Sequence, residues 1–564
     1  MTVSAIHDED NNPCNSPEAQ KQRWRQHFSS LLNRQSNFDS TELEIVIQRP
    51  EKHELAHPPT VDELCAALKS LKCGKAAGAS NIHPEMLKAA CRNPEFRELV
   101  LNLLHEVWKE QQVPKEWADA TLVPNPKKGN LTSCDNWRGI ALLDVVGKVA
   151  ARIIQLRLQE VAEKELPESQ CGFRKGRGCS DMIFVVRQLV EKASEHRSKL
   201  FLLFVDLRKA YDSVPRAAMW RALEKLGIPK YIINIIRSFH DGMTARMRVN
   251  GELTEEFPVE NGLRQGCTLA PTLFNLYACL LVERWSKRVE GEDGVGTYLR
   301  YQMDKKLFRR STRSYGECRL NECQFADDGV LLATTRHGAE KAAQSYIETA
   351  SAFGLTVSIS ETKLLATGHN INNNDKSTID LPQGSIDSVD EFTYLGSVVA
   401  SDSRIDAELT TRLANASRAF GALRTAVFKN KDLTVTTKRK VYQTCVLSVL
   451  LYGAGCWTPL RQHLRRLDGF HHRCIRIVLG ITSEQQWKQR ITSAATRQQW
   501  GDVQPVSLKV VRRRMEWLGH LARMSDDRMP KKVLFGWLPQ TRPACGSQEE
   551  MERRGPTKSQ DTGS

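Results

Sequence analysis

The feature that most constrains the fold is a pair of adjacent acids between two short apolar runs, in the sequence Phe-Ala-Asp-Asp at residues 325–328. The flanking runs predict a β-hairpin that carries Asp327 and Asp328 at its turn. Adjacent carboxylates repel each other, and a folded protein keeps them together chiefly where cations bind. A solvated surface turn is the simpler alternative, so the residues that accompany the pair decide between the two.

A third acid stands in a matching position. Asp206 ends the apolar run at residues 200–205, and that run predicts a buried strand. A strand that delivers one carboxylate at its end, together with a hairpin that delivers two more, is what two-metal phosphoryl transfer needs. The three acids together therefore indicate a nucleic-acid polymerase.

The formal net charge of +15 is concentrated at one end of the chain. Residues 403–564 contain 29 Lys and Arg against 13 Asp and Glu, whereas the remainder is near neutral. A basic segment attracts a polyanion, although an excess of Lys and Arg is also found on solvated surfaces. We predict nucleic acid as the partner of this segment.

The composition is that of a globular protein of the cell interior. No run approaches the roughly eighteen apolar residues that a bilayer span requires, so we expect no membrane partner. Residues 1–12 lack the apolar core of a secretory signal. The 15 cysteines include no Cys-x-x-Cys pair, which favours a reducing environment. We expect an intracellular protein, in the nucleus, the cytoplasm or both.

The predicted elements form an α+β pattern. Helices are expected at residues 22–32, from Thr60 onward, and at 144–164, 215–239 and 338–353; strands are expected at 120–124, 200–206, 244–250, 255–259, 355–359, 364–367 and 392–395. The Asn-Gly pair at residues 250–251 predicts a hairpin turn. Beyond residue 405 the chain is expected to be mostly helical.

In their order along the chain, these segments resemble the reverse transcriptase domain of non-LTR (LINE-type) retrotransposons. The matching motifs are Asn-Trp-Arg-Gly-Ile at 136–140, residues 170–181, Phe-Val-Asp-Leu at 204–207, Gly-Leu-Arg-Gln-Gly at 262–266, Phe-Ala-Asp-Asp at 325–328, Gly354 with Thr362, and Phe-Thr-Tyr-Leu-Gly-Ser at 392–397. The resemblance implies a right-hand polymerase with fingers, a palm built on an antiparallel sheet and a helical thumb, followed by a mostly helical C-terminal region.

The same resemblance divides the chain. Residues 1–59 would be an N-terminal linker with a helix remnant, and residues 60–400 the fingers and palm. Residues 401–538 would form the thumb and a helical nucleic-acid-binding region, and residues 539–564 a disordered tail.

The resemblance also assigns catalytic roles. Asp206, Asp327 and Asp328 would be the catalytic carboxylates and would hold two Mg²⁺ ions, or Mn²⁺, with the Leu207 carbonyl as a further ligand. A candidate general acid is Lys363, because Ser-Glu at residues 360–361 stands where the family has a lysine before Thr362.

The remaining assignments concern substrates: dNTPs, a DNA primer and an RNA template. The residues implied for dNTP binding are Lys127, Lys128, Arg138, Tyr211, Gln265 and Gly266. Arginine binds phosphate oxygens bidentately, and the Tyr211 ring would collide with a ribose 2′-hydroxyl. The residues implied for template and primer contact are Arg264, Tyr394, Leu395 and Gly396.

We therefore expect an RNA-directed DNA polymerase of a non-LTR retrotransposon. The alternative is a catalytically impaired, retrotransposon-derived nucleic-acid-binding protein. Related elements carry an endonuclease ahead of the polymerase, and residues 1–60 are too short for one, so we expect a truncated copy or a sequence that begins late. A group II intron-type maturase is disfavoured by residues 392–397 and the C-terminal region, and an RNA-making polymerase is disfavoured by Tyr211.

Overall fold

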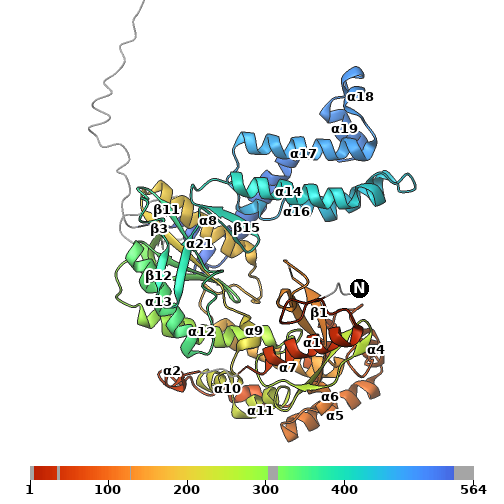
Figure 1. Ribbon diagram of the computed structural model, residues 1–564, viewed down its shortest axis with the longest axis vertical. Coiled ribbons are helices and arrows are strands. Elements are labelled where there is room, and N and C mark those ends of the chain that lie inside the picture. Colours follow the sequence, from red (N-terminus) through yellow and green to blue (C-terminus); the bar gives the residue numbers. More distant parts are fainter. Residues whose placement is uncertain (1–5, 35–37, 128, 303–314, 503, 539–564) are drawn as a thin grey trace, which may run out of the picture. The chain divides into compact units, whose positions relative to one another are not determined.

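The computed structural model describes residues 6–34, 38–127, 129–302, 315–502 and 504–538 (Figure 1). Two sequence predictions, those for Lys128 and for the tail at 539–564, lie outside the described residues. The chain divides into two compact units. The first comprises residues 1–176, 206–291 and 344–358, and the second comprises residues 177–205, 292–343 and 359–564.

The first unit is mainly helical. Its helices are α1 (Pro17–Leu32), α2 (Ser40–Glu44), α3 (Val61–Ser70), α4 (Pro84–Ala90), α5 (Pro94–Glu110), α6 (Lys115–Ala118), α7 (Val145–Glu165), α9 (Ala210–Ser213), α10 (Arg216–Lys225), α11 (Lys230–Ser238) and α12 (Ala270–Arg288). The helix predicted from Thr60 is confirmed as α3, which begins with a capping box between Thr60 and Glu63.

One small sheet lies in the first unit. Strand β1 (Ala120–Pro126) pairs antiparallel with β2 (Trp137–Leu142) and parallel with β4 (Thr244–Val249). The short strands β5 (Glu252–Leu253) and β6 (Phe257–Pro258) both pair antiparallel with β4. The predicted Asn-Gly hairpin is confirmed, because Asn250 and Gly251 have φ angles of 51° and 95°, as this tight turn requires.

Helix α1 packs against this sheet. It begins earlier than the predicted residue 22, because the Ser16 hydroxyl caps it by accepting a hydrogen bond from the Ala19 amide at 3.1 Å. The Trp24 ring meets that of Trp137 on β2 edge to face, with centroids 5.4 Å apart. The N-terminal helix is thus part of the core of the first unit.

Two predictions about this unit are wrong. The single helix predicted at 215–239 is two helices, α10 and α11, separated by Gly227 and Pro229. Gly227 has a φ of 75°, and a Cβ added to it would lie 2.1 Å from the Pro50 carbonyl oxygen, so the chain turns here where no side chain fits. The strand predicted at 355–359 is reduced to an isolated bridge between Leu207 and Val357.

The second unit is built on a six-stranded sheet with the order β12-β13-β11-β3-β10-β9. Its strands are β3 (Lys199–Val205), β9 (Glu322–Phe325), β10 (Asp328–Ala333), β11 (Lys363–Gly368), β12 (Ile379–Leu381) and β13 (Gly384–Ser388). Strand β3 is antiparallel to both of its neighbours, β10 and β11. The predicted strands at 200–206 and 364–367 are thereby confirmed, and the structure places them as neighbours in one mixed sheet.

Smaller elements complete this part of the unit. The two-stranded pairs are β7 (Thr297–Gln302) with β8 (Tyr315–Leu320), and β14 (Glu391–Tyr394) with β15 (Ser397–Ala400). Helix α8 (Cys179–Glu195) precedes β3, and α13 (Arg336–Ala352) runs from the second unit into the first.

The prediction that the chain is mostly helical beyond residue 405 is confirmed for the described residues. The α-helices there are α14 (Asp406–Leu423), α15 (Val435–Tyr442), α16 (Ser448–Leu450), α17 (Arg461–Leu479), α18 (Ser483–Lys488), α19 (Ser493–Trp500), α20 (Val506–Arg523) and α21 (Met529–Phe535). Helix α14 packs against α16 and α17, and the three run alongside one another in Figure 1.

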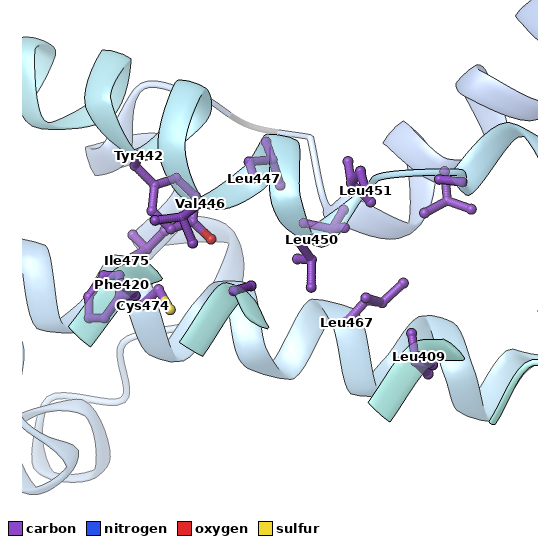
Figure 2. Packing of buried hydrophobic residues seen from close by; sticks show 14 of the residues in the cluster. Leu409, Phe420, Tyr442, Val446, Leu447, Leu450, Leu451, Leu467, Cys474 and Ile475 are labelled. Atoms are coloured by element: carbon purple, nitrogen blue, oxygen red, sulfur yellow. The ribbon is translucent and has the colours of Figure 1, made fainter. Parts of the chain in front are cut away.

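A separate hydrophobic core holds these helices together. Figure 2 shows Leu409 and Phe420 of α14 close to Leu467 and Ile475 of α17, and all four side chains are buried. The buried Tyr442 joins them and bonds through its hydroxyl to Nδ1 of His471 at 2.9 Å. No helix within the described residues is both long and apolar enough to cross a bilayer.

Candidate active site

The two adjacent acids lie where the sequence predicts them, at a tight turn between β9 and β10. Phe325 pairs with Asp328 across the hairpin, so Ala326 and Asp327 form the turn itself. Ala326 has a φ of 60°, in the left-handed region that alanine rarely occupies. The turn leaves the Asp328 side chain exposed and that of Asp327 partly exposed.

The third acid follows the central strand of the same sheet. Strand β3 ends at Val205, which lies opposite Gly329 of β10, the residue after Asp328. Asp206 is the next residue along the chain, and its carbonyl oxygen accepts a hydrogen bond from the Ser358 amide at 2.8 Å. The side chain of Leu207 is buried, and its backbone bridges to Val357. The backbone on both sides of the Asp206 side chain is therefore fixed by pairing.

These donors suit magnesium chemically. Mg²⁺ is usually bound through one or two carboxylates, and phosphate oxygens of the substrate and water complete its octahedron. Among the residues that the structure describes, no three or more His, Cys, Asp or Glu side chains are grouped so that they could hold a metal ion. Asp206, Asp327 and Asp328 thus suit magnesium by the chemistry of their oxygen donors.

Cations gather in the first unit around the end of β1 and the start of β2. Lys127 follows β1, and Arg138 lies on β2 with its side chain exposed. Lys209 pairs with Asp135 at 2.8 Å, so only part of this positive charge is balanced. Burial and then the positive charges of Lys209 and Arg138 lower the pKa of Lys127. A mutually repelling set of this kind favours the arrival of an anion.

The loop at residues 262–266 is held against α9 by several bonds. The Leu263 amide donates to the Tyr211 carbonyl at 2.8 Å, and the Tyr211 ring stacks on Phe274 with centroids 4.6 Å apart. The side-chain amide of Gln265 donates to Asp212 Oδ1 at 2.6 Å. Two residues predicted to bind dNTP, Tyr211 and Gln265, are thus joined through one short segment.

The backbone of Gly266 lies so close to β2 that no side chain fits between them. Its φ is 115°, and a Cβ added to it would lie 2.6 Å from the Ala141 carbonyl oxygen. The neighbouring Gln265 carbonyl accepts a hydrogen bond from the Ala141 amide at 2.7 Å. Both the backbone conformation and the close approach therefore require glycine at this position.

A small cavity of about 30 Å³ lies beside this contact. Its lining includes Asp212, Gln265, Ala141 and Gly139, and Phe28 of α1 closes one side. A Cβ added to Gly139 would lie 2.7 Å from the Phe28 ring. The cavity has room for about one water molecule.

The structure corrects the role predicted for Arg264. Its side chain is 6% exposed, and its guanidinium donates to the carbonyls of Phe239 and Trp117, both at 2.9 Å. A group that is committed to two buried carbonyls is not presented to a template. Arg264 therefore stabilises the loop at 262–266 from within.

Residues 394–396, predicted to contact the primer, form the tip of the β14–β15 hairpin. Leu395 and Gly396 have φ angles of 48° and 78°, which is the geometry of a two-residue hairpin turn. The Tyr452 hydroxyl donates to the Leu395 carbonyl at 2.7 Å, and Arg412 donates to the carbonyl of Gly396. The Tyr394 ring is buried, with its centroid 5.7 Å from that of Phe204.

The candidate general acid, Lys363, begins β11. It lies opposite Phe204 of β3, and its ammonium group pairs with Asp387 Oδ2 at 2.6 Å. The side chain of Asp387 is 61% exposed, so the pair lies at the surface. Lys363 must give up this partner before it can donate a proton elsewhere.

Sequence reasoning missed the contact of Asp212 with Gln265 and the position of Phe28. Asp212 directly follows Tyr211, and a carboxylate next to a residue predicted to bind the nucleotide is a signal that could have drawn attention to it. No local signal pointed to Phe28, because its partner Gly139 lies more than a hundred residues away along the chain.

The central part of the chain matches a known family. Residues 125–399 match the family described as reverse transcriptase (RNA-dependent DNA polymerase). An uncharacterised 149 kDa protein of transposon TX1 from Xenopus laevis is 28% identical over 294 residues, which are 50% of this chain and 22% of that protein. The probable RNA-directed DNA polymerase from transposon BS of Drosophila melanogaster is 23% identical over 462 residues, 80% of this chain and 47% of that protein. The chain thus spans less than half the length of either relative.

A solved structure is also similar. Apo telomerase from Candida tropicalis, truncated from its C-terminal domain, aligns with 53% of this chain and 59% of its own, at a TM-score of 0.34 and 13% sequence identity.

Proposed function

We propose that this chain is an RNA-directed DNA polymerase. Its residues 125–399 match the reverse transcriptase family and are related to the polymerases of non-LTR retrotransposons. It extends a DNA primer on an RNA template with dNTPs. The relative from transposon BS is named as a probable RNA-directed DNA polymerase, and we extend that activity to this chain.

One observation carries the proposal. Val205 at the end of β3 pairs with Gly329 of β10, and each has an acid as its neighbour along the chain, Asp206 and Asp328. Strand pairing therefore supports a role for these acids as one group, with Asp327 in the adjoining turn. A central strand and a tight hairpin are rigid supports, and catalytic carboxylates need rigid support.

The proposed reaction is a nucleotidyl transfer. The oxygen of the primer 3′-hydroxyl attacks the α-phosphorus of the dNTP, and the bond from that phosphorus to the oxygen bridging to the β-phosphate breaks. The hydroxyl proton passes to solvent water, and pyrophosphate leaves. The cations Lys127 and Arg138 stabilise the negative charge of the triphosphate, and Tyr211 excludes a ribose 2′-hydroxyl.

Asp206, Asp327 and Asp328 would hold the Mg²⁺ ions, together with the Leu207 carbonyl. Divalent metal ions bound there would increase the acidity of the primer 3′-hydroxyl and neutralise charge on the leaving group. Lys363 would protonate the pyrophosphate once its pair with Asp387 opens.

Primer extension tests the proposal. The full chain is incubated with an RNA template, a DNA primer, dNTPs and Mg²⁺, beside an Asp327→Asn variant of nearly identical shape. We expect extension by the wild type and a loss of at least about a thousandfold in the variant, because its neutral amide is a weaker metal ligand. Extension must also stop when EDTA removes the metal.

A matched control checks that the loss belongs to the site. Asp241 is an exposed acid of the same unit as Asp206, and it pairs with Arg237 at 3.2 Å. Asp241→Asn is expected to extend the primer at the wild-type rate. A folded wild-type protein that binds RNA without extending the primer would contradict the proposal and leave the impaired nucleic-acid-binding protein as the better description.

A further inference from the structure

We propose that Asp212 is a positioning residue that fixes the side-chain amide of Gln265 toward the incoming nucleotide. The inference rests on the proposed function, in which Gln265 contacts the dNTP. It adds a second carboxylate to the nucleotide site, with a role that is distinct from metal binding.

The hydrogen bond between the two side chains defines which way the amide points. A carboxylate only accepts hydrogen bonds, so the group of Gln265 that faces Asp212 Oδ1 at 2.6 Å has to be its NH₂. The amide carbonyl and the second N–H are then left for other partners. Without Asp212, the amide can rotate, and donor and acceptor exchange places.

Hydrogen bonds hold the backbone around this bond in place, so only the side chain of Gln265 can change its orientation. The Gln265 carbonyl is bonded to the Ala141 amide at 2.7 Å, and the Gly262 amide donates to the Val214 carbonyl at 3.1 Å. A Cβ added to Gly262 would lie 2.7 Å from the Asp212 carbonyl oxygen, so loop and helix are in direct backbone contact. A fixed backbone with one rotatable amide is the situation in which a single acceptor determines orientation.

The surroundings of Asp212 act on its charge in two directions. Burial is the larger effect and raises the pKa of Asp212 to about 6, whereas the bond from Gln265 and the cations Lys209, Lys127 and Arg138 lower that pKa. At neutral pH the carboxylate is ionised, and a bond from an amide to a charged acceptor is stronger than a neutral one. This carboxylate lies close to where a triphosphate is proposed to bind, and the two negative groups would repel each other. A favourable role must therefore offset this repulsion. Orientation of Gln265 is that role.

Steady-state kinetics of primer extension tests the inference with four variants: Asp212→Ala, Asp212→Asn, Gln265→Ala and the double alanine variant. Loss of one hydrogen bond to a charged group corresponds to about a tenfold effect. We expect Asp212→Ala to raise KM for dNTP about tenfold and to change kcat much less. Asparagine keeps an acceptor oxygen, so Asp212→Asn should recover much of this loss.

The double variant separates positioning from independent roles. If Asp212 acts through Gln265, the double alanine variant raises KM no more than Gln265→Ala alone, because the two effects are not additive. If the increase in KM of the double variant equals the product of the two single increases, the inference is wrong. A wild-type KM in Asp212→Ala, or a fall in its melting temperature without any change in KM, would also overturn it. Asp241→Ala serves as the control acid and should leave KM unchanged.

A binding measurement keeps this inference distinct from the polymerase proposal. The rise in melting temperature caused by dATP with Mg²⁺ is measured for the wild type, Asp212→Ala and Asp212→Asn, without primer or template. A wild type that gains stability from dATP but does not extend contradicts the polymerase proposal alone, and a smaller gain in Asp212→Ala still supports the inference. Equal gains in the wild type and Asp212→Ala, or no gain in the wild type, overturn the inference.

Discussion

The two units differ in whether their buried arginine side chains have a carboxylate partner. Around the loop at 262–266 of the first unit, Arg216 and Arg264 donate to backbone carbonyls, and neither makes an ion pair within the described part of the chain. In the second unit, Arg187 and Arg412 also donate to backbone carbonyls, but they lie 4.0 and 3.1 Å from the carboxylate of Glu408, whose side chain is 1% exposed.

The difference concerns charge balance. Carbonyl dipoles hold a guanidinium in place but do not cancel its charge, so the loop of the first unit keeps a positive field. In the second unit, Glu408 accepts from the Val398 amide at 2.6 Å and lies 3.1 Å from Arg412, so its negative charge compensates one of the two positive charges. The first arrangement suits a region proposed to receive a triphosphate, whereas the second suits a purely structural junction between β15 and α14.

The largest expected effect comes from breaking the junction of the second unit. Glu408→Gln keeps the shape of the side chain but leaves two buried arginines without a counter-charge, which costs about 3–5 kcal/mol of unfolding free energy. Urea unfolding followed by intrinsic fluorescence measures the change. Glu484→Gln, which removes an exposed pair with Lys488, is the control and should cost well under about 1 kcal/mol. A cost for Glu408→Gln as small as that of the control would show that Arg187 and Arg412 need no carboxylate.

A smaller effect is expected from the corresponding change in the first unit. Arg264→Met removes the buried charge itself, which offsets part of the loss, but it leaves the carbonyls of Phe239 and Trp117 unpaired. We expect a loss of about 2–3 kcal/mol in the same measurement. A loss larger than that of Glu408→Gln would mean that carbonyl-bound arginines matter more to stability than the ion-paired ones, which reverses the comparison.

The pH dependence of stability sharpens the comparison further, because Asp212 is the acid set among the cations of the first unit. Burial raises its pKa to about 6, so between pH 4 and 6 the folded protein keeps a proton that the unfolded chain has released. This contribution stabilises the protein below pH 4 and is lost as the pH rises through 6. Asp212→Asn cannot titrate, so its stability relative to wild type should rise across this window by on the order of 1–2 kcal/mol. Parallel pH profiles for the two proteins would contradict the assignment.

The smallest effect is expected at the surface pair of Lys363 and Asp387. Asp387→Asn should lower the unfolding free energy by no more than about 0.5 kcal/mol, because the acid is 61% exposed and well screened. The same small difference should vanish in 1 M NaCl. A loss of unfolding free energy above about 1 kcal/mol that does not depend on salt would show that this pair behaves like the buried ion pairs of Glu408 and not like a surface pair.

Much of the site could be predicted from the sequence where a local pattern determines the structure. The capping pattern at Thr60, the Asn-Gly turn at 250–251 and the acids at 327–328 each depend on a few neighbouring residues, and each is found as expected. The break between α10 and α11 was also encoded locally, by Gly227 and Pro229, but the apolar periodicity of the region outweighed it.

The contacts that the sequence could not provide are long-range bonds to backbone. From the sequence, Arg264 is predicted to be a cation that contacts nucleic acid, yet its partners are the carbonyls of Phe239 and Trp117. Every residue has a backbone carbonyl, so the sequence does not show which carbonyl will accept a hydrogen bond. The bond between Asp212 and Gln265 likewise joins two segments that are 53 positions apart. Residue type indicates the chemistry of a side chain, whereas its partner depends on tertiary structure.

The position of β3 in its sheet has a consequence for the timing of local opening. It is bonded along both edges, to β11 over residues 199–204 and to β10 over residues 201–205. The amides of such a strand exchange with solvent only when the sheet opens, whereas α18, which buries none of its residues, exchanges through small local fluctuations. Asp206 is attached to the end of the slower segment. Helix α18 can therefore fray and re-form many times while the strand that carries this acid stays closed.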